Sequence, residues 1–133
     1  MTRVLVDSSA LLTLLDRADP RHEAARVCLQ GLVDEDADLV AHGYVVAESL
    51  AVARRRFGVD GAVALIDDLL PAIEVVTVTP AIHVAALARY RRSLPSGTSF
   101  VDIVSLELMA HETIETAFAF DDDFAAAGVQ VIP

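Results

Sequence analysis

The chain has 133 residues and a mass of 14.2 kDa, so we expect a single domain over residues 1–133 with one hydrophobic core. Hydrophobic residues make up 54% of the sequence and the mean hydropathy is +0.49, which excludes an intrinsically disordered chain. The net charge of −10 and the pI of about 4.6 have the wrong sign for a protein that holds nucleic acid through basic patches alone.

The beginning of the chain predicts a strand followed by a helix. RVLVD at 3–7 is a short apolar strand, and Ser8 or Ser9 can cap the helix ALLTLLDRA that follows. The aspartate inside this apolar region argues against a secretory signal, and every apolar run is interrupted before the roughly 18 residues that a membrane span needs. We therefore expect a cytoplasmic protein with no membrane segment.

Strand and helix patterns alternate along the rest of the chain. Strands are expected at 38–42, 73–79, 116–120 and 129–132, and helices at 20–32, 43–58, 59–70, 80–93, 99–112 and 123–128. Pro20 and Pro80 favour helix starts, and Gly58 favours a helix end. Cys28 is the one cysteine, so we expect it to be a small core residue on a helix rather than a disulfide partner or nucleophile.

The alternation of strands and helices decides the fold class. Five short strands separated by helical segments predict an α/β fold, a three-layer α/β/α sandwich around a central, mostly parallel sheet. Folds of this class bind ligands beyond the C-terminal ends of the strands, at the point where the strand order reverses. Candidate site residues should therefore follow strands.

Four acidic residues occupy places where such a fold would bind a ligand. Asp7 closes the first strand, and Asp121 directly follows a later strand. Asp102 lies at the start of a helix, and Glu48 lies on an apolar stripe of another helix. A parallel sheet would bring the residues at strand ends and helix starts to the same edge.

Three of the four acidic residues also have a structural explanation. Asp7 can simply cap the helix that follows it. Ser99 and Asp102 have the spacing of a capping-box-like helix start. Glu48 can pair with a buried arginine, because an unpaired buried carboxylate costs several kcal/mol or becomes protonated. These explanations stay open at the level of the sequence.

The run DDDF at 121–124 divides by position. Asp121 ends a strand, as Asp7 does, and so belongs with the site. Asp122 or Asp123 can cap the short helix that follows, and Asp122 is assigned to the turn and cap. The three aspartates therefore need not share one role.

The clustered carboxylates predict a site for a divalent cation. Carboxylates held together in a partly desolvated cleft repel one another, and Mg²⁺ or Mn²⁺ would remove that repulsion. A cation bound there can activate a water for attack on phosphorus and stabilise the charge on the phosphate oxygens. The histidines have no spacing typical of a zinc site. An acidic protein could therefore recruit RNA phosphate through its metal.

Two groups of arginines can add local phosphate contacts. They lie at 54–56 and 89–92, and the RNA-binding candidates chosen from them are Arg54, Arg55, Arg91 and Arg92. The alternative is that they are solvated side chains placed near helix C-termini, where cations are favoured. The sequence contains no lysine, which argues against receiver domains and haloacid-dehalogenase phosphatases, since both families rely on a site lysine.

The order of these motifs resembles the PIN-domain ribonucleases, and most closely the VapC-type toxins of bacterial toxin–antitoxin pairs. The matching motifs are DSS at 7–9, Glu48, TSFVD at 98–102 and AFAFDDDF at 117–124, and the resemblance covers nearly the whole chain. It implies that the catalytic and metal-binding residues are Asp7, Glu48, Asp102 and Asp121, with Asp123 as a further candidate ligand and Ser8 and Ser99 as supporting residues.

The resemblance also implies a function. It indicates an endoribonuclease dependent on Mg²⁺ or Mn²⁺ that cleaves RNA and inhibits translation. It further implies a homodimer and a small antitoxin protein, often with a basic side chain that blocks the acidic groove. The alternative is a catalytically silent PIN-like module that binds RNA or protein and uses its acidic residues as caps.

Overall fold

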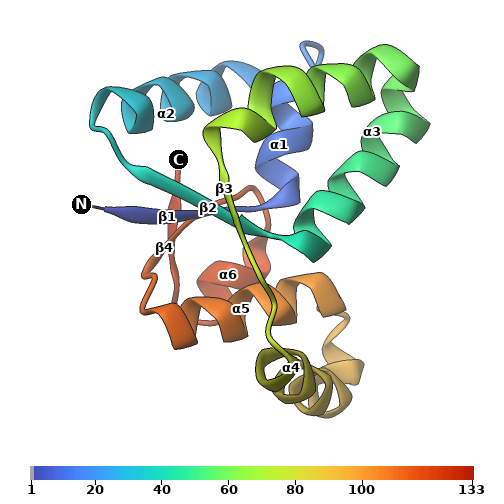
Figure 1. Cartoon of the computed structure of the whole chain (residues 1–133), viewed down its shortest axis with the longest axis vertical. Helices are drawn as coiled ribbons and strands as arrows, with labels where there is room; N and C mark the ends of the chain where they lie inside the picture. Colours follow the sequence, from blue (N-terminus) through green and yellow to red (C-terminus); the bar gives the residue numbers. More distant parts are fainter. Residues whose placement is uncertain (1) are drawn as a thin grey trace.

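The computed structural model describes residues 2–133, which form a five-stranded, all-parallel sheet with helices on both faces (Figure 1). The strands are β1 (Arg3–Val6), β2 (Asp38–His42), β3 (Glu74–Val76), β4 (Thr116–Phe118) and β5 (Gln130–Ile132). The α-helices are α1 (Ser8–Leu15), α2 (His22–Asp34), α3 (Gly43–Ala64), α4 (Pro80–Ser93), α5 (Phe100–Glu112) and α6 (Asp122–Ala126). The predicted three-layer α/β/α fold is confirmed.

Alternating side chains of the strands divide the core into two halves. In β1, Val4 and Val6 belong to the half formed with α1, α2 and α3, whereas Leu5 belongs to the half formed with α4, α5 and α6. In β4, Phe118 belongs to the half with α1, α2 and α3, and Ala117 belongs to the half with α4, α5 and α6. The strands are apolar on both faces, as expected for a parallel sheet covered by helices on both sides.

The element boundaries differ from the sequence prediction in a few places. Gly58 breaks the helical path inside α3, with φ of 72° and ψ of −162°, so the predicted end of a helix there is confirmed. The expected strand at 73–79 is paired over only Glu74–Val76. Cys28 is half-buried beside the core rather than inside it. Within residues 2–133, no helix has the length and apolar character needed to cross a membrane.

The strand order places the site. It runs β3-β2-β1-β4-β5, so the chain moves outward on one side of β1 and then returns to its other side through β4. The order therefore reverses between β1 and β4, and the C-terminal ends of these two strands are where this fold class binds ligands. Asp7 follows β1, and Asp121 comes three residues after β4.

Candidate active site

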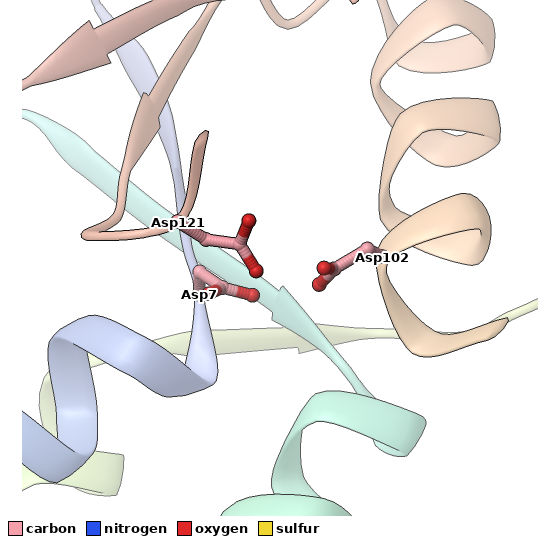
Figure 2. Close-up of side chains that lie close together, drawn as sticks. All are labelled: Asp7, Asp102 and Asp121. Carbon is pink, nitrogen blue, oxygen red and sulfur yellow. The ribbon is translucent and has the colours of Figure 1, made fainter. Parts of the chain in front are cut away.

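Three aspartates from three separate elements meet at this edge of the sheet. Asp7 follows β1, Asp121 precedes α6, and Asp102 lies in the first turn of α5. One carboxylate oxygen from each lies within 4.8 Å of the others, and Figure 2 shows the three side chains pointing toward a common centre. The prediction that strand-end and helix-start carboxylates meet is therefore confirmed for these three.

Asp7 is fixed through one of its two oxygens. Its Oδ2 accepts hydrogen bonds from the backbone N of Ser9 at 3.1 Å and from the Ser9 Oγ at 2.6 Å. Asp7 is the N-cap of α1, so the prediction that Ser8 or Ser9 caps this helix is wrong. Its Oδ1 is buried and has no hydrogen-bond partner within residues 2–133. Burial raises the pKa of Asp7, which is only 1% exposed.

Asp102 is held at the beginning of α5. Ser99 is the N-cap, and its Oγ accepts a hydrogen bond from the Asp102 backbone N at 3.1 Å, which confirms the predicted helix start. The Asp102 side chain is only 5% exposed. Burial, followed by the charges of Asp7 and Asp121, raises the pKa of Asp102 to about 9. Without a cation, this carboxyl group is therefore protonated at neutral pH.

Asp121 combines a structural role with its place in the cluster. Its Oδ1 accepts a hydrogen bond from the Asp123 backbone N at 2.8 Å, so Asp121 itself is the N-cap of α6. The prediction that Asp122 or Asp123 caps this helix is wrong. Asp122 is exposed, whereas Asp123 is half-buried, and burial followed by the charge of Asp121 raises the pKa of Asp123. The predicted division of the DDDF run therefore fails for the cap, because Asp121 both caps α6 and belongs to the group of three aspartates.

The sequence predicts only a helix cap for Ser9, whereas in the structure its hydroxyl makes two hydrogen bonds. Besides donating to Asp7, its Oγ accepts a hydrogen bond from the Phe120 backbone N at 2.9 Å. This one hydroxyl therefore connects the segment after β1 to the segment that carries Asp121. Ser9 belongs to the DSS motif at 7–9, but this motif does not identify Phe120 as its partner, because Phe120 lies 111 residues away in sequence.

Glu48 lies on the wall of the same cleft. The Oγ of Ser8, which the resemblance predicts to be a supporting residue, donates a hydrogen bond to the Glu48 Oε1 at 2.7 Å. No arginine among residues 2–133 pairs with Glu48, so the alternative that Glu48 belongs to a structural ion pair is wrong. The structure does not place Glu48 or Asp123 in the close group of three aspartates.

The aspartates lie in a cleft of about 400 Å³. Its lining residues are Asp7, Ser8, Ser9, Leu12, Thr13, Asp16, Asp19, Arg21, Glu48, Arg56, Gly97, Ser99, Asp102, Asp121 and Asp123. All of the predicted acidic and supporting residues are therefore brought to one cleft. The four arginines predicted to bind RNA are exposed, and none of them lines it. Arg21 and Arg56 line it instead.

The group of three aspartates suits a divalent cation. Within residues 2–133, no arginine or histidine forms an ion pair with Asp7, Asp102 or Asp121, so their charges are not balanced by protein side chains. The unpartnered, buried Oδ1 of Asp7 is an oxygen ligand already free of competing hydrogen bonds. A set of carboxylate oxygens alone is typical of sites for Mg²⁺ or Mn²⁺ rather than zinc.

The PIN domain family matches residues 4–130. The chain belongs to the PIN-domain family. Among curated PIN-domain relatives, the 23S rRNA-specific endonuclease VapC20 of Mycobacterium tuberculosis is 31% identical over 98% of this chain and 98% of its own. Ribonuclease VapC26 of the same species is 40% identical over a stretch that spans 50% of this chain and 47% of that protein. This PIN domain is therefore a homologue of VapC-type endoribonuclease toxins.

Solved structures agree with this assignment. The crystal structure of Mycobacterium tuberculosis VapC20, described as a sarcin–ricin loop cleaving toxin, has a TM-score of 0.84 and 30% identity, covering 98% of this PIN domain and 99% of that chain. VapBC2 from Rickettsia felis, bound to a promoter DNA fragment, has a TM-score of 0.73 at 11% identity, covering 98% and 97%. FitAB bound to a DNA fragment has a TM-score of 0.71 at 17% identity, covering 97% and 93%. The last two establish the shared fold only.

Proposed function

We propose that this PIN domain is a metal-dependent endoribonuclease, the toxin of a toxin–antitoxin pair, which cleaves RNA phosphodiesters in the cytoplasm and inhibits translation. The observation that carries the proposal is the unpartnered Oδ1 of Asp7, buried beside the carboxylates of Asp102 and Asp121. Asp102, buried beside the other two carboxylates, must take up a proton unless a cation is bound among them, and this requirement costs folding free energy at neutral pH. Such a cost is typical of a functional site rather than of helix capping.

The protein's own residues would divide the work. Asp7, Asp102 and Asp121 would hold Mg²⁺ or Mn²⁺, which supplies an activated water and neutralises charge on the phosphate when it is bound. Glu48 has its Oε1 held by Ser8, which leaves its Oε2 to orient a water or accept a proton beside the phosphate. Asp123 would complete the oxygen-rich edge as a further ligand, and Ser99 would fix the start of the helix that carries Asp102.

RNA as the substrate is supported by the relatives. VapC20 is named as an endonuclease specific for 23S rRNA, and its similarity extends over nearly all of this chain. We include a cognate antitoxin and a homodimer in the proposal. Exposed apolar side chains of α4 and the turn after it offer surface for a protein partner: Val84 is 64% exposed, Leu87 47% and Leu94 55%.

The test is cleavage of defined RNAs by the purified protein with Mg²⁺, with Mn²⁺ and with a chelator. We expect cleavage with either metal and none with the chelator. Glu48→Gln and Asp7→Asn should lower cleavage by at least about a hundredfold, because each removes one charge from the catalytic edge while nearly preserving its shape. Asp122→Asn is the matched control, since it removes the same charge from an exposed neighbour and should cleave like wild type.

Two outcomes would contradict the proposal. Cleavage by Glu48→Gln and Asp7→Asn at the wild-type rate would show that the acidic edge is not catalytic. Absence of cleavage by well-folded wild type with either metal would instead favour the silent binding module. The toxin role has its own test: expression in bacteria should arrest growth for wild type but not for Glu48→Gln. Equal growth of both strains, with equal amounts of folded protein, would exclude it.

A further inference from the structure

The cleft extends away from the three aspartates along α1 and α3. Beyond the aspartates its lining includes Leu12, Thr13 and Asp16 from α1 and the residue after it, and then Asp19 from the following turn. Arg56 enters the same cleft from α3, which packs against α1. The site is therefore longer than the group of carboxylates that would hold a cation.

Charge is distributed unevenly in this cleft. Seven of its lining residues are acidic, and only Arg21 and Arg56 are basic. Arg21 is already engaged, because its Nε and Nη2 donate to the two carboxylate oxygens of Asp19 at 3.1 and 3.0 Å, and its guanidinium lies 5.0 Å from the centre of the Phe120 ring. Within residues 2–133, Arg56 takes part in no ion pair. Arg56 is therefore the lining cation that can still bind an anion.

We propose that Arg56 binds an RNA phosphate that neighbours the one being cut. This inference rests on the proposed function. Arg56 follows Glu48 by eight residues on the same helix, which places their Cα atoms about 12 Å apart along the helix axis. The Arg56 guanidinium would therefore contact a phosphate further along the RNA strand. In that part of the cleft the bound metal ion does not offset the negative charge of the acidic lining residues. Its fork of donors suits the oxygens of a phosphate.

The neighbouring arginines supply matched controls. Arg54, Arg55 and Arg56 are consecutive, exposed and unpaired among the described residues, but only Arg56 lines the cleft. If the three acted only through overall charge, alanine at any of them would weaken RNA binding equally. If the contact is specific, alanine at position 56 alone should have the large effect. Because Arg56 is exposed, its substitution should leave the melting temperature unchanged.

The experiment measures binding of a short single-stranded RNA of mixed sequence in Mg²⁺ by fluorescence anisotropy at several salt concentrations. The proteins carry Glu48→Gln to suppress cleavage, alone or combined with R54A, R55A, R56A or R56K. We expect R56A to weaken binding about tenfold at low salt and to reduce the slope of log K against log salt by about 0.7, the value for one lost phosphate contact. R56K should keep that slope, and R54A and R55A should stay within about twofold of the parent.

Several results would overturn the inference. One is an unchanged salt slope in R56A, and another is equal weakening by R54A, R55A and R56A. A third is loss of antitoxin binding in R56A with RNA binding intact, which would assign Arg56 to the protein partner. The proposed function and the Arg56 contact can fail separately. RNA binding that depends on Arg56, with no metal-dependent cleavage by wild type, would support the contact and refute the nuclease. Metal-dependent cleavage that R56A leaves unchanged in both kcat and KM would support the nuclease and refute the contact.

Discussion

Replacing Asp102 with asparagine should stabilise the metal-free protein while abolishing cleavage. Asp102 is almost fully buried beside two other carboxylates, and burial with these charges raises its pKa from 3.8 to about 9. In the unfolded chain the same group is ionised at neutral pH. The metal-free protein must therefore take up a proton at this position in order to fold, and an asparagine of the same shape removes that requirement.

The size of the effect follows from the two pKa values. At pH 7 the unfolded group lies about 3 pH units above its pKa of 3.8, and each unit corresponds to about 1.36 kcal/mol, so the cost is about 4 kcal/mol at most. Because an amide does not fully reproduce the interaction of the protonated carboxyl group with Asp121, we expect Asp102→Asn to raise the free energy of unfolding by roughly 2–4 kcal/mol. For a domain of this length that corresponds to an increase in melting temperature of about 10 °C.

The stability difference between Asp102→Asn and wild type should depend on pH. A carboxyl group with a raised pKa in the folded state favours folding below about pH 4, and this contribution is lost as the pH rises through about 9. The stability difference between Asp102→Asn and wild type should therefore be near zero at pH 4 and grow toward pH 9. Thermal unfolding with a chelator measures it, and Asp122→Asn, which removes an exposed charge, is the control.

Metal binding supplies the second half of this assay. Mg²⁺ should raise the melting temperature of wild type, since a ligand of the folded state stabilises it, and should have a smaller effect on Asp102→Asn. A melting temperature of Asp102→Asn no higher than that of wild type at neutral pH in chelator would contradict a protonated, destabilising Asp102. A stability difference that did not change with pH would contradict the raised pKa of Asp102 as well.

Other substitutions test the supports of the site. Ser8→Ala frees the Glu48 carboxylate and should lower cleavage about tenfold with little change in melting; unchanged cleavage would remove that support from the mechanism. His42→Ala removes the N-cap of α3 and a buried hydrogen bond to Ser105. It should lower the free energy of unfolding, measured in urea, by about 2–3 kcal/mol. A loss below about 1 kcal/mol would contradict this prediction. Gly58→Ala forces a left-handed φ of 72° on alanine and should cost about 1–2 kcal/mol by the same method, and no loss would show that α3 straightens.

The residues that follow strands could be predicted because few alternatives existed for them. The apolar strands before Asp7 and Asp121 are short, and a parallel sheet must bring their C-terminal ends to one edge, although β4 ends at Phe118 rather than at the expected residue 120. Asp102 was predictable for a different reason, since Ser99 and the aspartate three positions later mark a helix start. Local pattern and global fold agree at these positions, so the sequence was sufficient.

Contacts between residues far apart in the sequence could not be predicted from local patterns. The Ser9 hydroxyl reaches the backbone of Phe120, and nothing in the local pattern around either residue identifies the other. The choice of Arg56 over Arg54 and Arg55 also depends on how α3 packs against α1, because the three arginines are equivalent in composition and differ only in direction. Helical periodicity turns successive side chains by about 100°, but only the packing of α3 against α1 decides which of these directions faces the cleft.

Capping and cation binding are not competing explanations for Asp7 and Asp121. Each carboxylate uses one oxygen for a backbone N–H, Oδ2 in Asp7 and Oδ1 in Asp121, and thereby fixes the direction of the other. The cap bond therefore orients the oxygen that a cation would need, as a supporting shell does in metal sites.

Replacing either aspartate with asparagine keeps a side-chain oxygen for the cap but removes the charge. Asp7→Asn and Asp121→Asn should consequently retain α1 and α6 while losing metal binding, whereas Asp7→Ala and Asp121→Ala should lose both, with about 1 kcal/mol of stability lost per cap. Equal melting of the asparagine and alanine variants in chelator would show that the cap bonds do not hold these side chains in place.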